Sequence, residues 1–330
     1  MVRFSVLGCG RIGRMHAANL ARHSDAELVS VFDLRPEASA EVAAQLGVVQ
    51  AASVEAVMAD PEVDAVLIAT STDTHVDLII SAAKAGKAVL CEKPIDLSME
   101  RVQRCWQEIA PLDPTVMIGF NRRYDPSFST LQRRVEAGEI GKVEQVIITS
   151  RDPAPPPLAY IKVSGGLFRD MMIHDFDIAR FVVGDIAEVT AFGNCVVEPA
   201  IGSAGDVDNA MVLLRATSGA LVHINNNRRA VYGYDQRLEV FGDKGMLLAE
   251  NHRATSVQAS TANYTRAADV ALPFFIERYA DAYASEISHF VTCIKDGSTP
   301  RSSFRDGLEA LRIADAANES LRTGKSVRLD

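Results

Sequence analysis

The sequence has few residues of the kinds that mark secreted, membrane or nucleic-acid-binding proteins. Its five cysteines are odd in number and form no Cys-x-x-Cys pair, so we expect free thiols and no bound metal. No apolar run is long enough to span a bilayer, and the opening MVRFSVLGCG lacks the pattern of a secretion signal. A net charge of -9 argues against nucleic-acid or anionic-membrane partners. We therefore expect a cytoplasmic location.

What is present is an ordinary globular composition over 330 residues, enough for about two domains. The first recognisable motif is GCGRIG, which follows the strand-like VRFSVL and precedes a helical segment near 11–23. In this position Gly8 makes a tight turn, Gly10 lets the backbone approach a pyrophosphate, and Gly13 lets the helix pack closely. The helix N-terminus offers N–H groups to phosphates. The motif predicts a dinucleotide site.

An acidic residue supports this interpretation and bears on the choice of cofactor. The second strand-like segment, AELVSVFD, ends at Asp33, twenty residues after Gly13. A carboxylate there binds the ribose hydroxyls of NAD and repels the extra phosphate of NADP. Arg35 could partly offset that repulsion, so we expect NAD, with NADP as a weaker alternative. The other reading of Asp33 is a plain cap at the strand end.

The alternation of strands and helices predicts the architecture. Helices near 36–46, 74–85 and 98–110 alternate with strands, which indicates a doubly wound parallel sheet over residues 1–120. Polar loops at 70–75 and 91–94 follow two of these strands, where ligands bind in such sheets. Residues 121–330 are rich in consecutive strands, which predicts an α+β domain with a mainly antiparallel open sheet. Two late helices, near 275–295 and 303–323, are expected, and the last helices may pack back on the first domain.

The stretch SGGLFRDMMIHDFDIARF, residues 164–181, carries an unusual group of polar residues. Its apolar residues recur near a helical period, and on one helix Asp170 and His174 share a face. These two could share a substrate; alternatively, the histidine is only satisfied by a neighbouring carboxylate. Asp175 and Asp177 are expected to be solvated or structural.

The order GxGxxG, EKP and GG-x-x-x-D-x-x-x-H-D-x-D resembles the glucose–fructose oxidoreductase and inositol dehydrogenase family over essentially the whole chain. Within it, GFNRRYDPSF, the segment from RDPAPPP to HDFD, and YGYD are most similar to the myo-inositol 2-dehydrogenases. The resemblance implies that Lys93, Asp170 and His174 form the catalytic centre. In this role His174 is the general base for oxidising a secondary hydroxyl of myo- or scyllo-inositol, and Lys93 stabilises the developing oxyanion.

The resemblance also implies a fuller set of site residues and an assembly. Expected at the cofactor are Gly8, Gly10, Arg11, Ile12, Gly13, Asp33, Arg35, Thr70, Ser71, His75, Glu92 and Lys93. Expected at the polyol substrate are Lys93, Asn121, Arg122, Tyr124, Arg151, Asp152, Asp170, His174 and Tyr234, with Tyr232 and Asp235 as further candidates. We expect a homotetramer joined through the second sheet. Two other functions stay open: an aldose 1-dehydrogenase acting on D- or L-glucose, and a non-catalytic dinucleotide-binding sensor.

Overall fold

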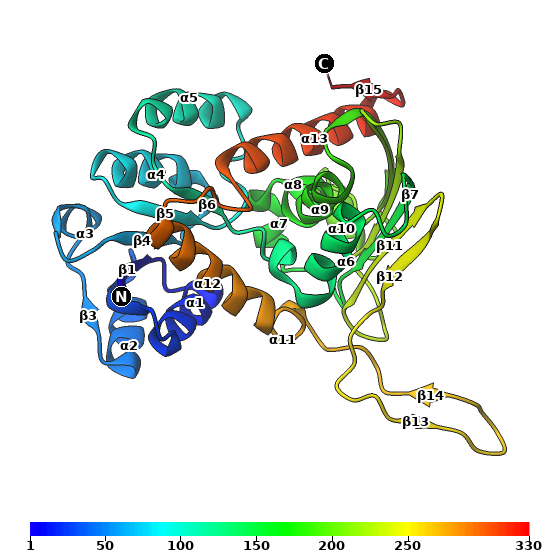
Figure 1. Ribbon diagram of the computed structural model, residues 1–330, viewed down its shortest axis with the longest axis horizontal. Helices are drawn as coiled ribbons and strands as arrows, with labels where there is room; N and C mark the ends of the chain where they lie inside the picture. The colour runs from blue at the N-terminus through cyan, green and yellow to red at the C-terminus, as the bar shows by residue number, and fades with distance from the viewer. Residues whose placement is uncertain (330) are drawn as a thin grey trace. The chain divides into compact units, whose positions relative to one another are not determined.

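The computed structural model describes residues 1–329 and forms two compact units. The first unit contains residues 1–124 and 281–311, and the second contains residues 125–280 and the chain from 312 onward. The chain therefore leaves the first unit near Tyr124 and returns to it with the helix α12 (Ala280–Asp296) (Figure 1). No helix in the described residues is both long and apolar enough to cross a membrane.

The first unit is built on a six-stranded parallel sheet in the order β3-β2-β1-β4-β5-β6. Its strands are β1 (Val2–Leu7), β2 (Ala26–Phe32), β3 (Val49–Gln50), β4 (Ala65–Ile68), β5 (Ala88–Cys91) and β6 (Val116–Ile118). The central strand β4 is buried on both faces, which explains its continuous apolar run. The predicted doubly wound parallel sheet is confirmed.

Helices cover this sheet, and their extents match the predicted periodicity closely. They are α1 (Arg11–Arg22), α2 (Pro36–Leu46), α3 (Val54–Ala59), α4 (His75–Lys84) and α5 (Met99–Ile109). Apolar side chains of α1, α2 and α12 join those of β1 and β2 in one core. The six-residue α3 was not predicted. Its start is set by Ser53, whose hydroxyl accepts a hydrogen bond from the backbone N–H of Ala56.

The second unit is built on a seven-stranded sheet in the order β12-β11-β7-β10-β9-β8-β15. Its strands are β7 (Val143–Arg151), β8 (Ile186–Asn194), β9 (Asn209–Ala216), β10 (Leu221–Asn227), β11 (Asp235–Gly242), β12 (Gly245–Ala249) and β15 (Val327–Arg328). All neighbours are antiparallel except β7 and β10. The predicted mainly antiparallel sheet is confirmed.

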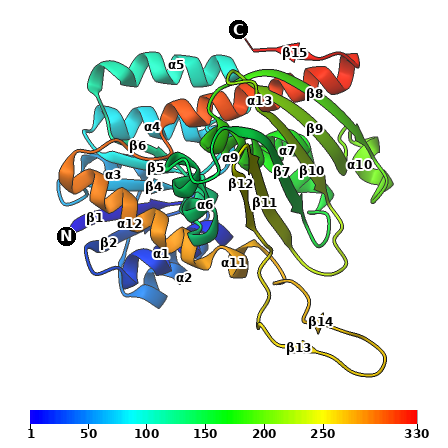
Figure 2. The same ribbon diagram turned by 45° about the vertical axis from the view of Figure 1, so that its right-hand side comes forward.

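Helices pack on one face of this second sheet (Figure 2). The core beneath them is made by the sheet together with α6 (Pro126–Glu136), α8 (Gly166–Asp170), α9 (Ile173–Val183) and the later part of α13 (Phe304–Thr323). The remaining helices are α7 (Leu158–Ser164), α10 (Pro199–Ser203) and α11 (Phe275–Arg278). The expected single helix near 275–295 was wrong, because α11 and α12 are separated at Tyr279, whose hydroxyl donates to Gln236 Oε1.

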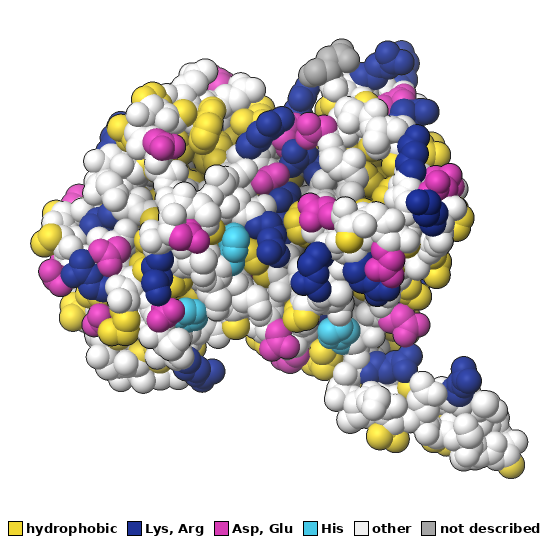
Figure 3. All heavy atoms as spheres, in the orientation of Figure 1, with side chains coloured by type: hydrophobic (Ala, Val, Ile, Leu, Met, Phe, Trp, Pro, Cys, Tyr) yellow, Lys and Arg dark blue, Asp and Glu magenta, His cyan; other side chains and the backbone are white. Residues whose placement is uncertain are grey.

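An extended arm leaves the second unit after β12. Its short ladder joins β13 (Gln258–Ala259) to β14 (Ala267–Ala268), and residues 253–270 are all exposed (Figure 1). Most of its side chains are uncharged, as the space-filling view shows (Figure 3). The root of the arm is fixed, because the backbone N–H of Tyr234 donates to the carbonyl of Leu272 and that of Ala271 to the carbonyl of Tyr232.

A fully buried ion pair ties the two ends of the second unit's first segment together. Asp125 accepts hydrogen bonds from the backbone of Ser127 and Phe128, which caps α6. Its other carboxylate oxygen lies 2.5 Å from Nη1 of Arg278, at the end of α11. Because both side chains are withdrawn from water, losing one partner leaves an uncompensated charge in the core.

We predict that Asp125→Ala lowers the free energy of unfolding by about 3–5 kcal/mol, the usual cost of breaking a buried pair. Urea denaturation followed by circular dichroism measures it. The matched control is Glu139→Ala, which removes an exposed carboxylate paired with Arg134 and should change little. Equal effects in the two variants would show that the Asp125–Arg278 pair does not stabilise the unit.

Candidate functional site

The turn after β1 is shaped by close backbone contacts at two glycines. Gly8 has a φ of +97°, and a Cβ there would lie 2.4 Å from the carbonyl oxygen of Ala69. A Cβ on Gly13 would lie 1.8 Å from the carbonyl oxygen of Gly8. Gly10, by contrast, faces open space and stands at the N-cap of α1 without a side-chain cap. The free helix N-terminus beside Gly10, with Arg11 and Ile12 in its first turn, fits a pyrophosphate.

Asp33 lies directly beside this turn and is held by the backbone. One of its carboxylate oxygens accepts from the N–H of Cys9 at 2.7 Å, and the other from the N–H of Arg35 at 2.8 Å. The guanidinium of Arg35 is mostly exposed, with Nε 3.6 Å from Asp33 Oδ1. These bonds fix the carboxylate at the strand end, where it suits the ribose of a dinucleotide. Burial, followed by the charge of Asp33, raises the pKa of the Cys9 thiol to about 11.

The two polar loops beyond β4 and β5 are joined by His75. Its ring is buried, with Nδ1 2.8 Å from the carbonyl oxygen of Pro94 and Nε2 3.2 Å from that of Thr70. Burial lowers the pKa of His75, which favours the neutral ring. Both contacts are to carbonyl oxygens, so only the nitrogen that carries the proton donates a hydrogen bond. His75 thus contacts the backbone of both loops, the loop of Thr70 and Ser71 and the loop that carries Glu92 and Lys93.

The segment 121–124 is more deeply buried than its polar sequence suggests. The hydroxyl of Tyr124 is 2.8 Å from Ser302 Oγ and donates to Met117 Sδ at 3.2 Å, so it belongs to the core of the first unit. Our expectation that Tyr124 contacts substrate is therefore not supported by its position. Asn121 and Arg122 are likewise buried.

The sequence predicted one helix over residues 164–181, but the structure has two helices there, and this changes where Asp170 and His174 lie. The chain forms α8 and α9 with a break at Met171 and Met172, and the carbonyl of Leu167 accepts from the N–H of both. Asp170 therefore ends α8, and His174 lies in the first turn of α9.

The carboxylate of Asp170 is held by two residues that sequence reasoning missed. Tyr160 of α7 donates its hydroxyl to Asp170 Oδ1 at 2.8 Å, and the buried Arg228 places Nη2 3.8 Å from Oδ2. Arg228 follows β10 and lies far from Asp170 in the sequence, so no spacing pattern could have linked them. The arrangement keeps a negative charge fixed next to the start of α9.

A second polar network lies where β7, β10 and β11 run side by side. Arg151 donates from Nη1 to the hydroxyl of Tyr232 at 2.8 Å and from Nη2 to Asn225 Oδ1 at 2.9 Å. Tyr232 in turn donates to Asp235 Oδ2 at 2.7 Å, and Arg237 forks onto the same carboxylate. The structure thus brings Arg151, Tyr232 and Asp235 together, as a set of fixed donors and acceptors.

The neighbouring candidates have different surroundings. Asp152 follows β7, and its backbone bonds to the carbonyl of Asn227 and the N–H of Ala230. Tyr234 is buried, edge-on to the rings of Phe274 and Tyr279.

Asp175 and Asp177 are completely buried. Asp175 accepts from Asn226 Nδ2 at 2.9 Å, so this carboxylate is bonded to β10. Of the two expected alternatives, solvated or structural, burial excludes the first for both residues, and the bond to Asn226 fits the second for Asp175. A buried carboxylate needs such a partner because water cannot reach it.

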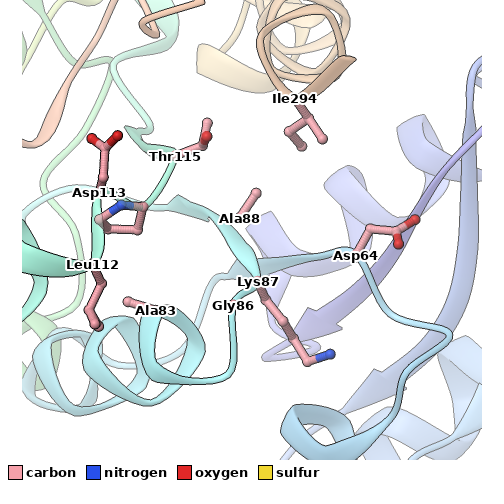
Figure 4. Close-up of a pocket in the computed structure, with 10 residues that line it drawn as sticks. Asp64, Ala83, Gly86, Lys87, Ala88, Leu112, Asp113, Thr115 and Ile294 are labelled. Carbon is pink, nitrogen blue, oxygen red and sulfur yellow. The ribbon is translucent and has the colours of Figure 1, made fainter. Parts of the chain in front are cut away.

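A cavity of about 270 Å³ lies elsewhere in the first unit (Figure 4). It is lined by Ala88 at the start of β5, by Asp113 and Thr115 before β6, and by Ile294 of α12. Lys87 at its edge donates to the carbonyls of Asp60 and Val63. This is the amino-terminal edge of the parallel strands, opposite to the edge where such sheets bind ligands. The cavity is therefore separate from the candidate site.

Comparison with known proteins covers both halves of the chain. Residues 2–120 match the model of an oxidoreductase family with an NAD-binding Rossmann fold. Residues 128–248 match the model of the GFO/IDH/MocA C-terminal domain.

Similar proteins align over nearly their full length. Inositol 2-dehydrogenase of Rhizobium meliloti is 47% identical, over 99% of each chain. Myo-inositol 2-dehydrogenase of Thermotoga maritima is 48% identical, over 100% of this chain and 99% of that one. Among solved structures, a myo-inositol dehydrogenase from Corynebacterium glutamicum has a TM-score of 0.97 at 47% identity, covering 100% of this chain and 99% of that one. Scyllo-inositol dehydrogenase from Lactobacillus casei, solved with NAD(H) and scyllo-inositol, has a TM-score of 0.92 at 29% identity, covering 99% of each chain.

We predict that Asp33→Ser raises the Michaelis constant for NAD and shifts the NADP/NAD preference toward NADP by at least about tenfold, the value of one charge-assisted hydrogen bond. Initial rates with each cofactor measure the ratio. Asp25→Ser, just before β2 at its other end, is the control and should leave the ratio unchanged. A constant ratio in Asp33→Ser would remove Asp33 as the ribose-binding residue.

Proposed function

The chain belongs to the GFO/IDH/MocA family of NAD-binding oxidoreductases, and on that premise we propose that it oxidises a ring hydroxyl of myo- or scyllo-inositol with NAD. The observation that carries the proposal is the full-length similarity, at 47% and 48% identity, to two inositol 2-dehydrogenases. Similarity over both units matters, because the second unit contains most of the side chains expected at the substrate. The product of such a reaction is a ketoinositol.

The first unit offers groups that suit NAD. The open space at Gly10, the uncapped start of α1 and the backbone-held Asp33 suit the pyrophosphate and the ribose, respectively. When bound, the nicotinamide supplies the hydride acceptor. The protein must then orient the hydroxyl-bearing carbon and take up the hydroxyl proton.

We propose that His174 is the general base that accepts the hydroxyl proton of the substrate, because the ordinary histidine pKa near 6.5 suits a base at neutral pH. Asp170, fixed by Tyr160 and Arg228, supplies a negative charge near the start of α9 and stabilises an imidazolium there. Lys93 donates to the substrate oxygen as negative charge develops on it. As the hydride leaves carbon, the oxygen gives its proton to His174, so the products are the ketone, reduced cofactor and protonated histidine.

We further propose that Asp152 and Tyr234 help to recognise the remaining ring hydroxyls, with Asn121 and Arg122 as candidates in the first unit. Arg151, Tyr232 and Asp235 were also expected at the substrate. Their network lies on the face of the second sheet opposite to α8 and α9, because Asn225 of β10 bonds to Arg151 whereas the next residue, Asn226, bonds to Asp175 of α9.

A panel of purified substrates tests the activity directly. Myo-inositol, scyllo-inositol, D-glucose and L-glucose are each offered with NAD and with NADP, and the absorbance of the reduced cofactor is followed. We expect the highest kcat/KM with an inositol and NAD. A higher value with a glucose would favour the aldose 1-dehydrogenase alternative, and no turnover with any member would favour the sensor.

We predict that His174→Ala reduces kcat by about a hundredfold to ten-thousandfold, the range for losing general acid–base catalysis. The dissociation constant for NAD should stay close to that of the wild type, because the cofactor residues lie in the first unit. His23→Ala, at the end of α1, is the matched control and should keep kcat. Activity of His174→Ala within threefold of the wild type would exclude His174 as the base.

We also propose a homotetramer in a reducing compartment such as the cytoplasm, where its free cysteines would persist. Support for assembly comes from the face of the second sheet that the helices leave uncovered. Outward-facing side chains on five strands there are apolar and about half exposed or more: Phe192, Met211, Leu213, Leu221, Phe241, Met246 and Leu248. Contiguous apolar surface of this kind marks an interface, and closed symmetry is usual.

We predict that Leu213→Glu, in the middle of this face, shifts the protein to a smaller species in sedimentation velocity at micromolar concentration. A charge there would have to be buried without a partner if two sheets packed together. Leu34→Glu, an exposed position in the first unit, serves as the control. A wild-type protein that sediments as an active monomer would contradict the proposed assembly.

A further inference from the structure

The first unit contains a buried carboxylate that the proposed chemistry does not use. Glu286 of α12 is 0% exposed, and neither of its carboxylate oxygens has a hydrogen-bond partner within residues 1–329. Two other ionisable groups are close by: His16 of α1 and Glu92, the residue after β5. One side-chain atom from each of the three lies within 4.8 Å of the others. Three segments of the chain thus converge on one point.

The charges in this cluster can be assigned from its contacts. His16 Nε2 is 2.8 Å from Glu92 Oε1, so the partly exposed Glu92 has a partner for its negative charge. Glu286 has no such partner, and burial, followed by the charge of Glu92, raises its pKa well above the ordinary value. A buried carboxylate without a hydrogen-bond partner is disfavoured as an anion, so the surroundings of Glu286 favour its neutral acid form beside Glu92.

Packing fixes where the Glu92 carboxylate can lie. A Cβ on Gly119 would approach Glu92 Oε2 to 3.0 Å, so the glycine leaves the space that this oxygen needs. The ring of His16 is held edge-on by Tyr283, at 5.5 Å between centroids. Glu92 immediately precedes Lys93, and its N–H donates to the carbonyl of Ile68 in the neighbouring strand. Glu92 is thus confined on the side of His16 and on the side of Gly119.

We propose that His16 and Glu286 are positioning residues that hold Glu92 as a carboxylate in one orientation at the cofactor edge of the sheet, with Glu286 acting as a neutral acid. This rests on the proposed function, in which Glu92 and Lys93 adjoin the nicotinamide end of NAD. Glu286 excludes water from the back of the cluster without adding a second negative charge. A charged Glu286 would repel Glu92 and disturb the strand end that carries Lys93.

The test compares a neutral isostere with an apolar residue at position 286. Glu286→Gln keeps the shape and polarity of a protonated acid, so it should preserve NAD affinity and kcat within about threefold. Glu286→Leu should weaken NAD binding about tenfold, because a branched apolar side chain packs differently against His16 and leaves no polar group beside the Glu92 carboxylate. Calorimetric titration with NAD measures affinity without requiring turnover. Asp281→Asn, on the exposed side of α12, is the matched amide control.

Two further measurements address the protonation state and His16. The infrared spectrum of Glu286→Gln is subtracted from that of the wild type at neutral pH. The difference spectrum should contain the carbonyl band of a protonated carboxyl group. His16→Gln, which keeps a donor near the Nε2 position, should bind NAD better than His16→Leu.

Equal damage in Glu286→Gln and Glu286→Leu, or a missing infrared band, would overturn the assignment of a neutral acid. So would a stoichiometric divalent metal in the wild type that Glu286→Gln loses, because the cluster would then hold a cation. If instead the infrared band and the NAD affinities are as expected while no inositol is oxidised, the proposed substrate fails and the positioning role of Glu286 stands.

Discussion

The close approach of α1 to the turn after β1 is the constraint on which the rest of the first unit depends. The helix can dock there only because position 13 has no Cβ, since that atom would overlap the carbonyl oxygen of Gly8. Docking leaves the helix N-terminus open at Gly10 and directs the N–H of Cys9 to Asp33. One turn further along α1, the same docking brings His16 to Glu92. A single backbone contact thus places groups at both ends of the expected cofactor site.

The second unit relies on buried polar partners instead of glycines. Asp125 with Arg278, Asp175 with Asn226, and Asp170 near Arg228 each join segments that are distant in the sequence. Such pairs contribute little net stability when compared with apolar packing, but a missing partner is costly. They therefore favour one arrangement of α8, α9 and the strands over near alternatives. That selectivity is what a site with fixed donors and acceptors requires.

Regular elements of the fold could be predicted from the sequence because their signals are local. The strand at 2–7 and the helix at 36–46 follow from apolar periodicity and from Pro36 and Gly47 at the helix ends, and both were confirmed. The start of α6 also had a local signal, Asp125 followed by Pro126, which was overlooked. The break at Met171 had no such signal, because the segment contains no proline there and the backbone of Met171 stays close to helical.

The difference between local signals and contacts between distant residues also applies to the expected site, which has a cofactor part and a substrate part. The expected cofactor part consists largely of backbone groups. Their geometry requires glycines at fixed spacing, and such a spacing can be recognised in the sequence. The residues expected at the substrate act through their side chains: Arg151 bonds to Asn225 and Tyr232, and Asp170 lies near Arg228, across sequence separations that no motif encodes. Tyr124 is the opposite case. It was expected at the substrate because of its motif, but its hydroxyl bonds to Ser302 in the core of the first unit. A chain of this kind therefore reveals its cofactor class more readily than its substrate, whose identity depends on which distant side chains the fold brings together.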